Sequence, residues 1–179
     1  MRLKNSEHQF GLVAIVLHWF MALLIIGMLA VGLYMVTLPW DLQKLKLYGL
    51  HKECGFLVLA LVSFRFVWRL SNIIPTLSIP WWEKTIALLV HWAFYGFMFA
   101  MPITGWLVTS AAGITTSFFG LFTIPNLIGP NKELLELFEM AHQWIAYGLI
   151  LTILLHTAAA LKHHFIDRDD ILKRMISWK

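Results

Sequence analysis

Residues 138–161 read FEMAHQWIAYGLILTILLHTAAAL, an apolar stretch with a histidine near each end. No Asp, Glu, Lys or Arg occurs from Met140 to Leu161, and about 20 apolar residues are enough to cross a bilayer as a helix. His142 and His156 are 14 residues apart, so a helix turns both toward one face and separates them by about 21 Å along its axis. The stretch therefore predicts a membrane-spanning helix with one imidazole near each face of the membrane.

Three other stretches have the same apolar character. Two lie wholly within segments that contain no Asp, Glu, Lys or Arg, and the third carries Arg65 near its end, a position that membrane insertion tolerates. We expect an all-α membrane protein with a single domain over residues 1–179, folded as a bundle of four transmembrane helices without strands. The predicted helices are Phe10–Val36, Leu47–Arg69, Thr85–Ser110 and Phe138–Leu161.

The composition excludes two other classes of protein. Hydrophobic residues make up 59% of the chain and charged residues 13%, with a mean hydropathy of +0.72. In soluble domains, hydrophobic residues make up about 45–50% and charged residues about 25%. Aromatic residues make up 15%, which excludes a disordered chain, and the single cysteine, Cys54, excludes a disulfide framework.

The distribution of basic residues predicts the orientation. Of the 14 Lys and Arg residues, the four on the side of the first and third connections are Lys44, Lys46, Lys52 and Lys132. The other ten lie beside the chain ends and the second connection, so the positive-inside rule makes both termini cytoplasmic. We expect a multi-pass membrane protein whose basic pI reflects topology, with membrane lipid and no nucleic acid as partner.

Each histidine of the last predicted helix has a partner at matching depth. His18 lies early in the first helix, level with His156, and His51 opens the second helix, level with His142. Two imidazoles per site, with no carboxylate or cysteine to complete a shell, favour haem iron over zinc, copper or a di-iron centre. We expect two haem groups, held by His18 with His156 on the cytoplasmic side and by His51 with His142 on the periplasmic side. No Cys-x-x-Cys-His motif occurs, so covalent attachment is excluded.

Two basic residues are candidate cofactor contacts. Arg65 should face the bundle at cytoplasmic depth, where it either pairs with a haem propionate or extends to lipid headgroups. Lys52 follows His51 and forms a basic cluster with Lys44 and Lys46. This cluster either draws small anions such as superoxide, or a small acidic redox protein, to the edge of the periplasmic haem, or it contacts lipid headgroups.

His91 has no partner in this scheme. It opens the third predicted helix, level with His18 and His156, and it either replaces His18 as a ligand, contacts a propionate, or serves a quinone. Quinone reduction takes two electrons and two protons, and a neutral imidazole is a suitable proton donor. Tyr95 lies one turn further along and adds a hydroxyl, so His91 and Tyr95 are the candidate catalytic residues.

Glycines and the connecting segments leave further alternatives open. Gly32, Gly105 and Gly148 either give room for a macrocycle or reflect the general frequency of glycine in membrane helices. The run Phe118–Phe122 either enters the membrane interface or caps the bundle. His163 and His164 are expected in a solvated interfacial tail.

Several motifs together resemble one family along the whole chain. They are Leu17-His18-Trp19, Leu50-His51-Lys52, Pro102-Ile103-Thr104-Gly105 and the stretch Ala159–Phe165, and they look like those of the prokaryotic cytochrome b561 family. This resemblance implies a four-helix inner-membrane protein with two b-type haems that exchanges electrons with the quinone pool.

Two classes of function are compatible with these features. The first is a self-contained electron-transfer protein, with quinone oxidoreductase activity, acting between a periplasmic small molecule or protein and ubiquinone or menaquinone. The second is a haem-bearing membrane anchor for a larger dehydrogenase or hydrogenase, which requires a companion redox subunit. The chain has no Gly-x-Gly-x-x-Gly fingerprint, so oxidation beyond haem chemistry would have to come from that companion.

Overall fold

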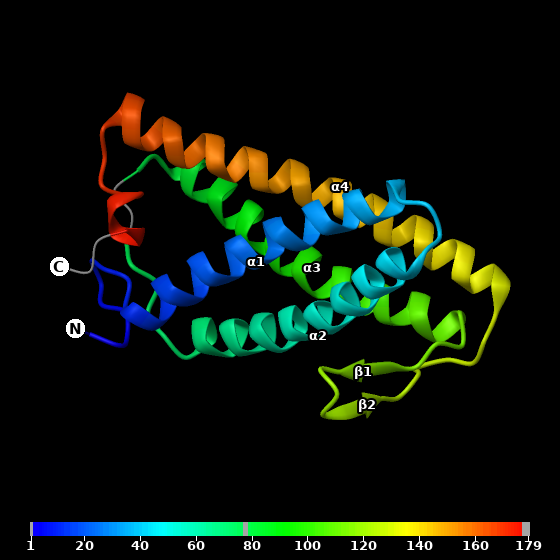
Figure 1. Cartoon of the computed structure of the whole chain (residues 1–179). Coiled ribbons are helices and arrows are strands. Elements are labelled where there is room, and N and C mark those ends of the chain that lie inside the picture. The colour runs from blue at the N-terminus through cyan, green and yellow to red at the C-terminus, as the bar shows by residue number, and fades with distance from the viewer. Residues whose placement is uncertain (1, 77–78, 177–179) are drawn as a thin grey trace.

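Four long helices form the body of the molecule (Figure 1), a computed structural model that describes residues 2–76 and 79–176. The helices are α1 (Leu12–Thr37), α2 (Leu42–Leu70), α3 (Trp81–Ala111) and α4 (Lys132–Lys162). A hairpin of β1 (Thr116–Phe118) and β2 (Phe122–Ile124) follows α3, and the short helices η1 (His163–Asp167) and η2 (Lys173–Met175) follow α4. Both chain ends lie at one end of the bundle, called here the termini end, and the opposite end is called the hairpin end.

Three of the helices are long and apolar enough to cross a membrane. They are α1, α3 and α4, the last with η1 as its continuation. Helix α2 does not reach the same hydropathy because its first half carries three lysines and a glutamate, and Arg65 and Arg69 lie near its end. The helical architecture agrees with the sequence-based expectation.

Polar caps, rather than the edges of the apolar runs, determine where two of the helices begin. The carboxylate of Asp41 accepts a hydrogen bond from the Lys44 amide at 2.8 Å, and the Asn131 side chain accepts one from the Leu134 amide at 3.0 Å. Both residues satisfy amides that the first helical turn leaves free. Helices α2 and α4 therefore begin several residues before the predicted starts at Leu47 and Phe138.

The expectation of a chain without strands is wrong. Strands β1 and β2 pair antiparallel, with Thr116 opposite Ile124, and Phe119 and Gly120 turn the chain with positive φ values of 48° and 74°. The hairpin is tied to the end of α3, because the indole nitrogen of Trp106 donates to the Pro125 carbonyl at 2.9 Å. Figure 1 shows the hairpin folded back beside α2 from the end of α3.

The residues after α4 close the termini end. The indole nitrogen of Trp19 on α1 donates to the Met175 carbonyl at 2.7 Å, and Arg174 donates to the Thr76 carbonyl at 3.0 Å. The amide of Thr76 in turn donates to the carbonyl of Glu7 at 2.9 Å. The C-terminal segment thereby joins α1 to the connection between α2 and α3.

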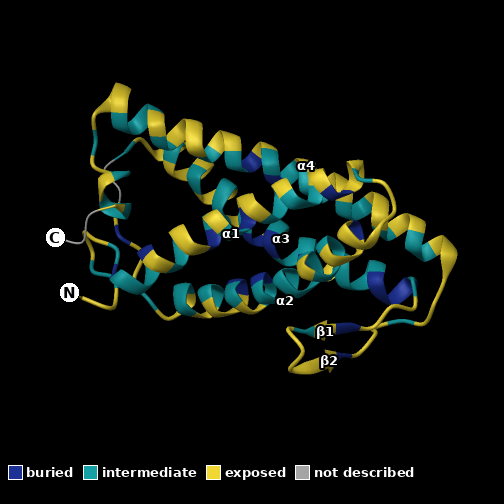
Figure 2. Cartoon of the chain, viewed as in Figure 1, coloured by how far each residue is buried: buried dark blue, intermediate teal, exposed yellow. Residues whose placement is uncertain are grey.

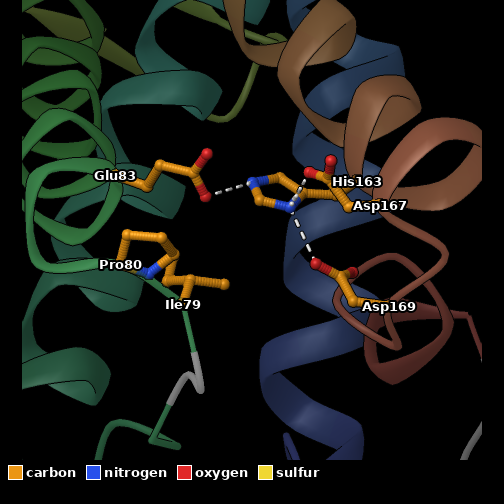
Figure 3. A pocket seen from close by; sticks show the side chains of 6 residues that line it. All are labelled: Ile79, Pro80, Glu83, His163, Asp167 and Asp169. Atoms are coloured by element: carbon orange, nitrogen blue, oxygen red, sulfur yellow. Dashed lines mark hydrogen bonds and ion pairs between the residues drawn. The ribbon is translucent and has the colours of Figure 1, made fainter.

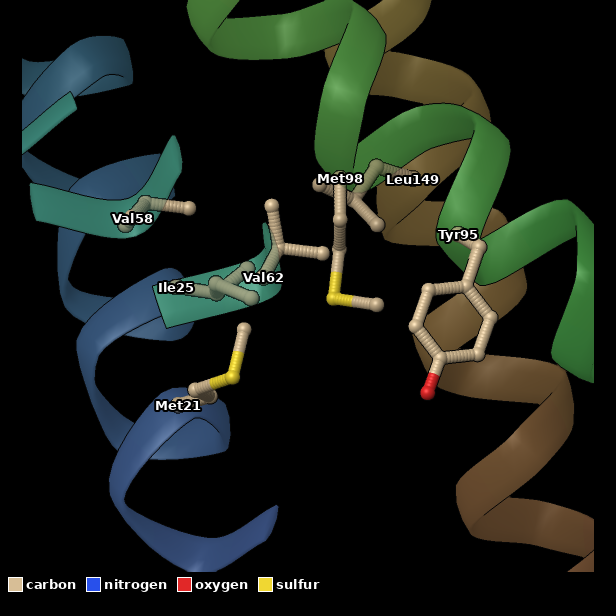
Figure 4. Close-up of a cluster of buried hydrophobic side chains, with 7 residues drawn as sticks. All are labelled: Met21, Ile25, Val58, Val62, Tyr95, Met98 and Leu149. Carbon is tan, nitrogen blue, oxygen red and sulfur yellow. The ribbon is translucent and has the colours of Figure 1, made fainter. Parts of the chain in front are cut away.

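A compact apolar core occupies the middle of the bundle. Close backbone packing joins α1 to α2, α2 to α3 and α3 to α4. Side chains from all four helices meet between them (Figure 4) and are Met21, Ile25, Val58, Val62, Tyr95, Met98 and Leu149. Figure 2 shows buried residues along the inside of the bundle and exposed residues along its outer faces, where most side chains are apolar. An apolar outer surface is what a lipid environment requires.

The contact between α3 and α4 depends on one glycine. A Cβ on Gly148 would lie 2.8 Å from the ring of Phe97, which packs against the core. We expect Gly148→Ala to destabilise the bundle by about 1–3 kcal/mol because it overpacks this contact. At about 2–4 °C per kcal/mol the melting temperature in detergent should fall by several degrees.

Gly96→Ala is the matched control for this substitution. A Cβ on Gly96 would meet no atom within 4 Å, and alanine is the better helix former. Its melting temperature should therefore be unchanged or slightly higher. Equal melting temperatures for the two variants would show that Phe97 does not constrain position 148.

Candidate cofactor sites

One pair of imidazoles faces across the bundle toward its hairpin end. The rings of His51 on α2 and His142 on α4 have centroids 6.4 Å apart and planes 77° apart. With metal–nitrogen bonds of about 2.0 Å, as in zinc–imidazole sites, two imidazoles on opposite sides of one metal ion have centroids roughly 6 Å apart. The separation therefore suits a single metal ion between the two rings.

Small residues flank both of these rings. A Cβ on Gly32 of α1 would lie 3.3 Å from Cε1 of His51, and one on Gly105 of α3 would lie 3.3 Å from Cε1 of His142. Side chains at either position would press on the imidazoles. Gly32 and Gly105 therefore leave room at the level where His51 and His142 meet, whereas Gly148 serves the packing of Phe97.

The hydroxyl of a threonine on α3 lies beside Nδ1 of His142. The hydroxyl of Thr104 lies 2.8 Å from the Ala100 carbonyl, 2.9 Å from the Met101 carbonyl and 2.9 Å from Nδ1 of His142. A hydroxyl has one hydrogen to donate, so when a carbonyl takes it, the oxygen accepts from the Nδ1–H of His142. Nε2 is then unprotonated and free to bind a metal. Nδ1 of His51, by contrast, is buried without a hydrogen-bond partner.

Three imidazoles gather toward the termini end. The ring of His156 on α4 lies 6.1 Å from that of His18 on α1 and 5.9 Å from that of His91 on α3, measured between centroids. The structure thus brings His156 together with both of its candidate partners, and the ring separations do not choose between them. A guanidinium nitrogen of Arg65 lies 3.2 Å from Nδ1 of His18. Because a guanidinium only donates, Nδ1 accepts in this contact and Nε2 of His18 carries the proton.

The remaining predicted site residues have different surroundings. Tyr95 is buried in the core, its ring edge-to-face with Phe66 and beneath the guanidinium of Arg69. Lys52 is half-buried on α2 next to His51. Lys44, which we grouped with it as an anion-attracting residue, is only 6% exposed. Its ammonium donates to the Leu38 carbonyl at 2.8 Å and lies 4.6 Å from the ring centre of Trp40. Lys44 therefore fixes the loop before α2, and only Lys46 and Lys52 remain as candidates for attracting anions.

Sequence reasoning missed a polar cluster at the termini end. Instead of lying in a solvated tail, the His163 side chain is only 13% exposed. Its Nδ1 lies 2.7 Å from a carboxylate oxygen of Asp169 and 3.1 Å from one of Asp167, and its Nε2 lies 3.9 Å from Glu83 (Figure 3). The ammonium of Lys162 pairs with both Glu83 and Asp167. The four residues other than Lys162 line a pocket of about 320 Å³ together with Ile79 and Pro80.

The spacing His163–Asp167 was the available sequence signal for this cluster. Residues four apart meet on a helix, but here the turn is a π-helix, and Arg168 reverses the chain with a φ of 55°. These two features bring Asp169 to the same imidazole. Glu83 comes from the first turn of α3, which no local pattern connects to residue 163.

Comparison with known proteins assigns the chain to one family. Residues 9–178 match the family described as prokaryotic cytochrome b561. The chain belongs to this family. It is 34% identical over 180 residues to cytochrome b561 homolog 2 of Escherichia coli strain K12, with 98% of this chain and 95% of that protein aligned.

Two further relatives extend the comparison. Cytochrome b561 homolog 1 of the same strain is 31% identical over 129 residues, covering 70% of this chain and 72% of the relative. A protein of Yersinia pestis named probable superoxide oxidase CybB is 27% identical over 192 residues, covering 100% of this chain and 99% of the relative. Prokaryotic cytochromes b561 are membrane electron-transfer proteins that bind b-type haem.

The residues of this cytochrome b561 suit such a group. His51 and His142 would hold haem iron through their imidazoles, and the ring separation, the unpartnered Nδ1 of His51 and the glycine-flanked space around both rings are consistent with that role. The donor set also fits, because no carboxylate or thiolate is needed to complete it.

The threonine contact gives a test of the hairpin-end site. Thr104→Val keeps the shape of the side chain but removes the hydroxyl that fixes the tautomer of His142, and loss of such a partner costs about 10–100-fold in metal affinity. We expect haem to transfer faster to excess apomyoglobin from this variant than from the unaltered cytochrome. Absorbance in the Soret region follows the transfer.

Thr152→Val on the same helix as His142 is the control. The hydroxyl of Thr152 donates to the Gly148 carbonyl at 2.7 Å and is likewise buried. Its loss should leave the rate of haem transfer unchanged. Indistinguishable rates for the two variants would contradict a role of Thr104 in orienting His142.

Proposed function

We propose that this cytochrome b561 carries two haem b groups and moves single electrons across a bacterial inner membrane, from a periplasmic donor to a quinone. The observation that carries the proposal is the presence of an imidazole pair at each of two levels along α4, at 6.4 Å and 6.1 Å between ring centroids. His142 and His156 are separated by about 21 Å along the helix, so one metal ion cannot serve both pairs.

Helix α2 is the fourth span in this proposal. Its 29 residues extend about 43 Å, which is enough to cross a bilayer, and it packs against both α1 and α3. Lys44, Lys46 and Lys52 lie in its first turns, at the membrane surface of the hairpin end. With both termini cytoplasmic, the hairpin end is periplasmic and the termini end is cytoplasmic.

In this arrangement His51 and His142 hold the periplasmic haem, and His18 and His156 hold the cytoplasmic one. When bound, the iron would supply one-electron chemistry, and both of its protein ligands at each site would be histidines. Ligation by Nε2 of His18 would require its proton to move to Nδ1, and Arg65 would then have to release Nδ1. A carboxylate such as a haem propionate is a better partner for a guanidinium than a neutral imidazole, so Arg65 is the proposed propionate contact.

The quinone site of the proposal lies at the termini end beside His91. Its imidazole is close to His156 but is not needed once His18 and His156 are paired. An imidazole can accept a proton and, once protonated, donate it, so His91 is the proposed proton donor to the reduced quinone. Tyr95, buried one turn further along α3, is proposed to support this site from the core side.

Superoxide is the proposed electron donor at the periplasmic end. The Yersinia pestis relative is named a probable superoxide oxidase, and Lys46 and Lys52 provide a basic surface next to His51 that attracts a small anion. Overall, two superoxide anions and one quinone take up two protons and give two dioxygen molecules and one quinol. The quinone is reduced, the superoxide is oxidised, and charge and atoms balance.

Single substitutions of the ligands test the pairing. We expect His51→Ala or His142→Ala to remove the periplasmic haem and retain the other, and His18→Ala or His156→Ala to do the reverse, because each haem loses one axial ligand. A pyridine haemochrome assay against protein concentration gives the haem count, and low-temperature reduced-minus-oxidised spectra show which haem remains.

His91→Ala separates the quinone role from ligation. It should keep both haems and slow electron exchange with a soluble quinone at least several-fold. If instead His91→Ala loses a haem that His18→Ala retains, the cytoplasmic pair is His91 with His156. Loss of both haems from all four ligand variants, in protein that still folds, contradicts the assignment of two separate sites.

Purification with a flavin- or metal-containing subunit would instead favour the role of a membrane anchor.

Steering of superoxide predicts a salt-dependent rate. In a Lys46→Gln/Lys52→Gln variant, haem reduction by superoxide should be several-fold slower at low ionic strength, and its dependence on salt should be reduced. The attraction is screened over about 10 Å at 0.1 M salt. Stopped-flow absorbance with a superoxide pulse measures the rate.

Lys132→Gln is the control, since the Lys132 side chain is 88% exposed at the same end and pairs only loosely with Glu136 at 3.9 Å. It should behave like the unaltered protein. If the rate of haem reduction changes neither with salt nor with the double substitution, Lys46 and Lys52 contact lipid headgroups instead.

A further inference from the structure

The tip of the β1–β2 hairpin exposes large apolar side chains. Leu121 is 76% exposed, Phe122 57% and Phe119 44%. The hairpin lies within a segment, Thr85–Asn131, that contains no Asp, Glu, Lys or Arg. Several large apolar groups together on a water-facing loop carry a free-energy cost that usually indicates a binding partner or a membrane.

The base of the hairpin is fixed to the bundle. Thr116 and Ile124, which pair across its base, are both buried, and β1 contacts α2. The Leu127 amide donates to the Ser110 hydroxyl at 3.0 Å, in addition to the hydrogen bond between Trp106 and Pro125. The tip is therefore held in place while its side chains stay exposed, which excludes a cap in which these side chains are buried against the helix ends.

The direction of the hairpin gives the identity of the partner. In Figure 1 the tip does not project beyond the ends of the helices but turns back beside α2, toward the middle of the bundle. The tip therefore lies on the side of the bundle, where the outer faces of the helices also expose large apolar side chains. A partner that approached from the aqueous phase would meet the end of the bundle rather than its side.

We propose that the hairpin tip inserts into the lipid headgroup and acyl-chain boundary of the leaflet at the hairpin end. The inference rests on α3 being a membrane span and is independent of the haem pairs, the quinone and the superoxide donor. Phe119, Leu121 and Phe122 enter the bilayer, and the glycine turn between strands exposes no charge to it.

The strands themselves limit how deep the tip lies. A two-stranded sheet has unpaired N–H and C=O groups along both edges, and lipid-exposed open edges do not occur in the hydrocarbon region. Amphipathic segments at the interface bury their apolar side chains by about 5–10 Å. The side chains at the tip therefore lie in the upper acyl region while the strand edges keep contact with headgroups and water.

Spin labels at the tip test this placement. Leu121→Cys is made in a Cys54→Ala background, labelled with a nitroxide and reconstituted with haem into phosphatidylcholine vesicles. Power saturation then compares collisions with oxygen, which concentrates in lipid, and with a neutral nickel chelate, which stays in water. Leu23→Cys on the middle of α1, 71% exposed, is the lipid-facing reference, and Glu133→Cys at the exposed start of α4 is the water-facing one.

We expect the oxygen-to-nickel collision ratio at residue 121 to be several-fold above that at residue 133 and to approach that at residue 23. Phe122→Cys is a second tip position in case Leu121→Cys does not fold, and an unaltered haem spectrum is the criterion for folding. A ratio at either folded tip variant equal to that at residue 133 overturns the proposal. That outcome leaves the proposed function intact, since no electron-transfer measurement enters it.

Discussion

The spacing of two imidazoles on one helix is the constraint on which the rest of the bundle depends. His142 and His156 lie on one face of α4 and about 21 Å apart along it, so polar groups must be accommodated at two separate levels. Leu149 is midway between them and packs with side chains of α1, α2 and α3 in the apolar core. The core is therefore confined to the middle of the bundle, and it separates the two imidazole levels with close-packed hydrocarbon.

Glycine shows how the same residue type serves different purposes at different depths. At the hairpin end Gly32 and Gly105 approach the imidazoles of His51 and His142, so their missing side chains preserve space around polar rings. Gly148 lies nearer the core, and its missing side chain is replaced by the ring of Phe97. Gly32 and Gly105 leave space open beside the imidazoles, whereas the space beside Gly148 is occupied by the Phe97 ring. Nothing in the local sequence distinguishes these two uses of glycine.

The two imidazole levels could be predicted because helical periodicity converts residue number directly into depth and direction. Contacts that depend on a turn could not. Lys44 is three residues from the Asp41 cap and lies over the ring of Trp40, so a lysine that counts as a surface charge in the sequence is buried. His163 is surrounded by carboxylates only because a π-helical turn follows α4. The sequence did not predict the hairpin because its strands have three residues each, and their pairing with one another and the contact of β1 with α2 stabilise them more than any local preference.

The hydrogen bond between Trp19 and the Met175 carbonyl joins residues 156 positions apart in the chain. A ribosome completes α1 long before it adds the residues that close the termini end, so this contact cannot form during most of synthesis. Until then, only packing against the later helices can hold α1, and His18 on it, in position. The contact that joins α1 to the segment after α4 therefore forms only after all four helices have been made.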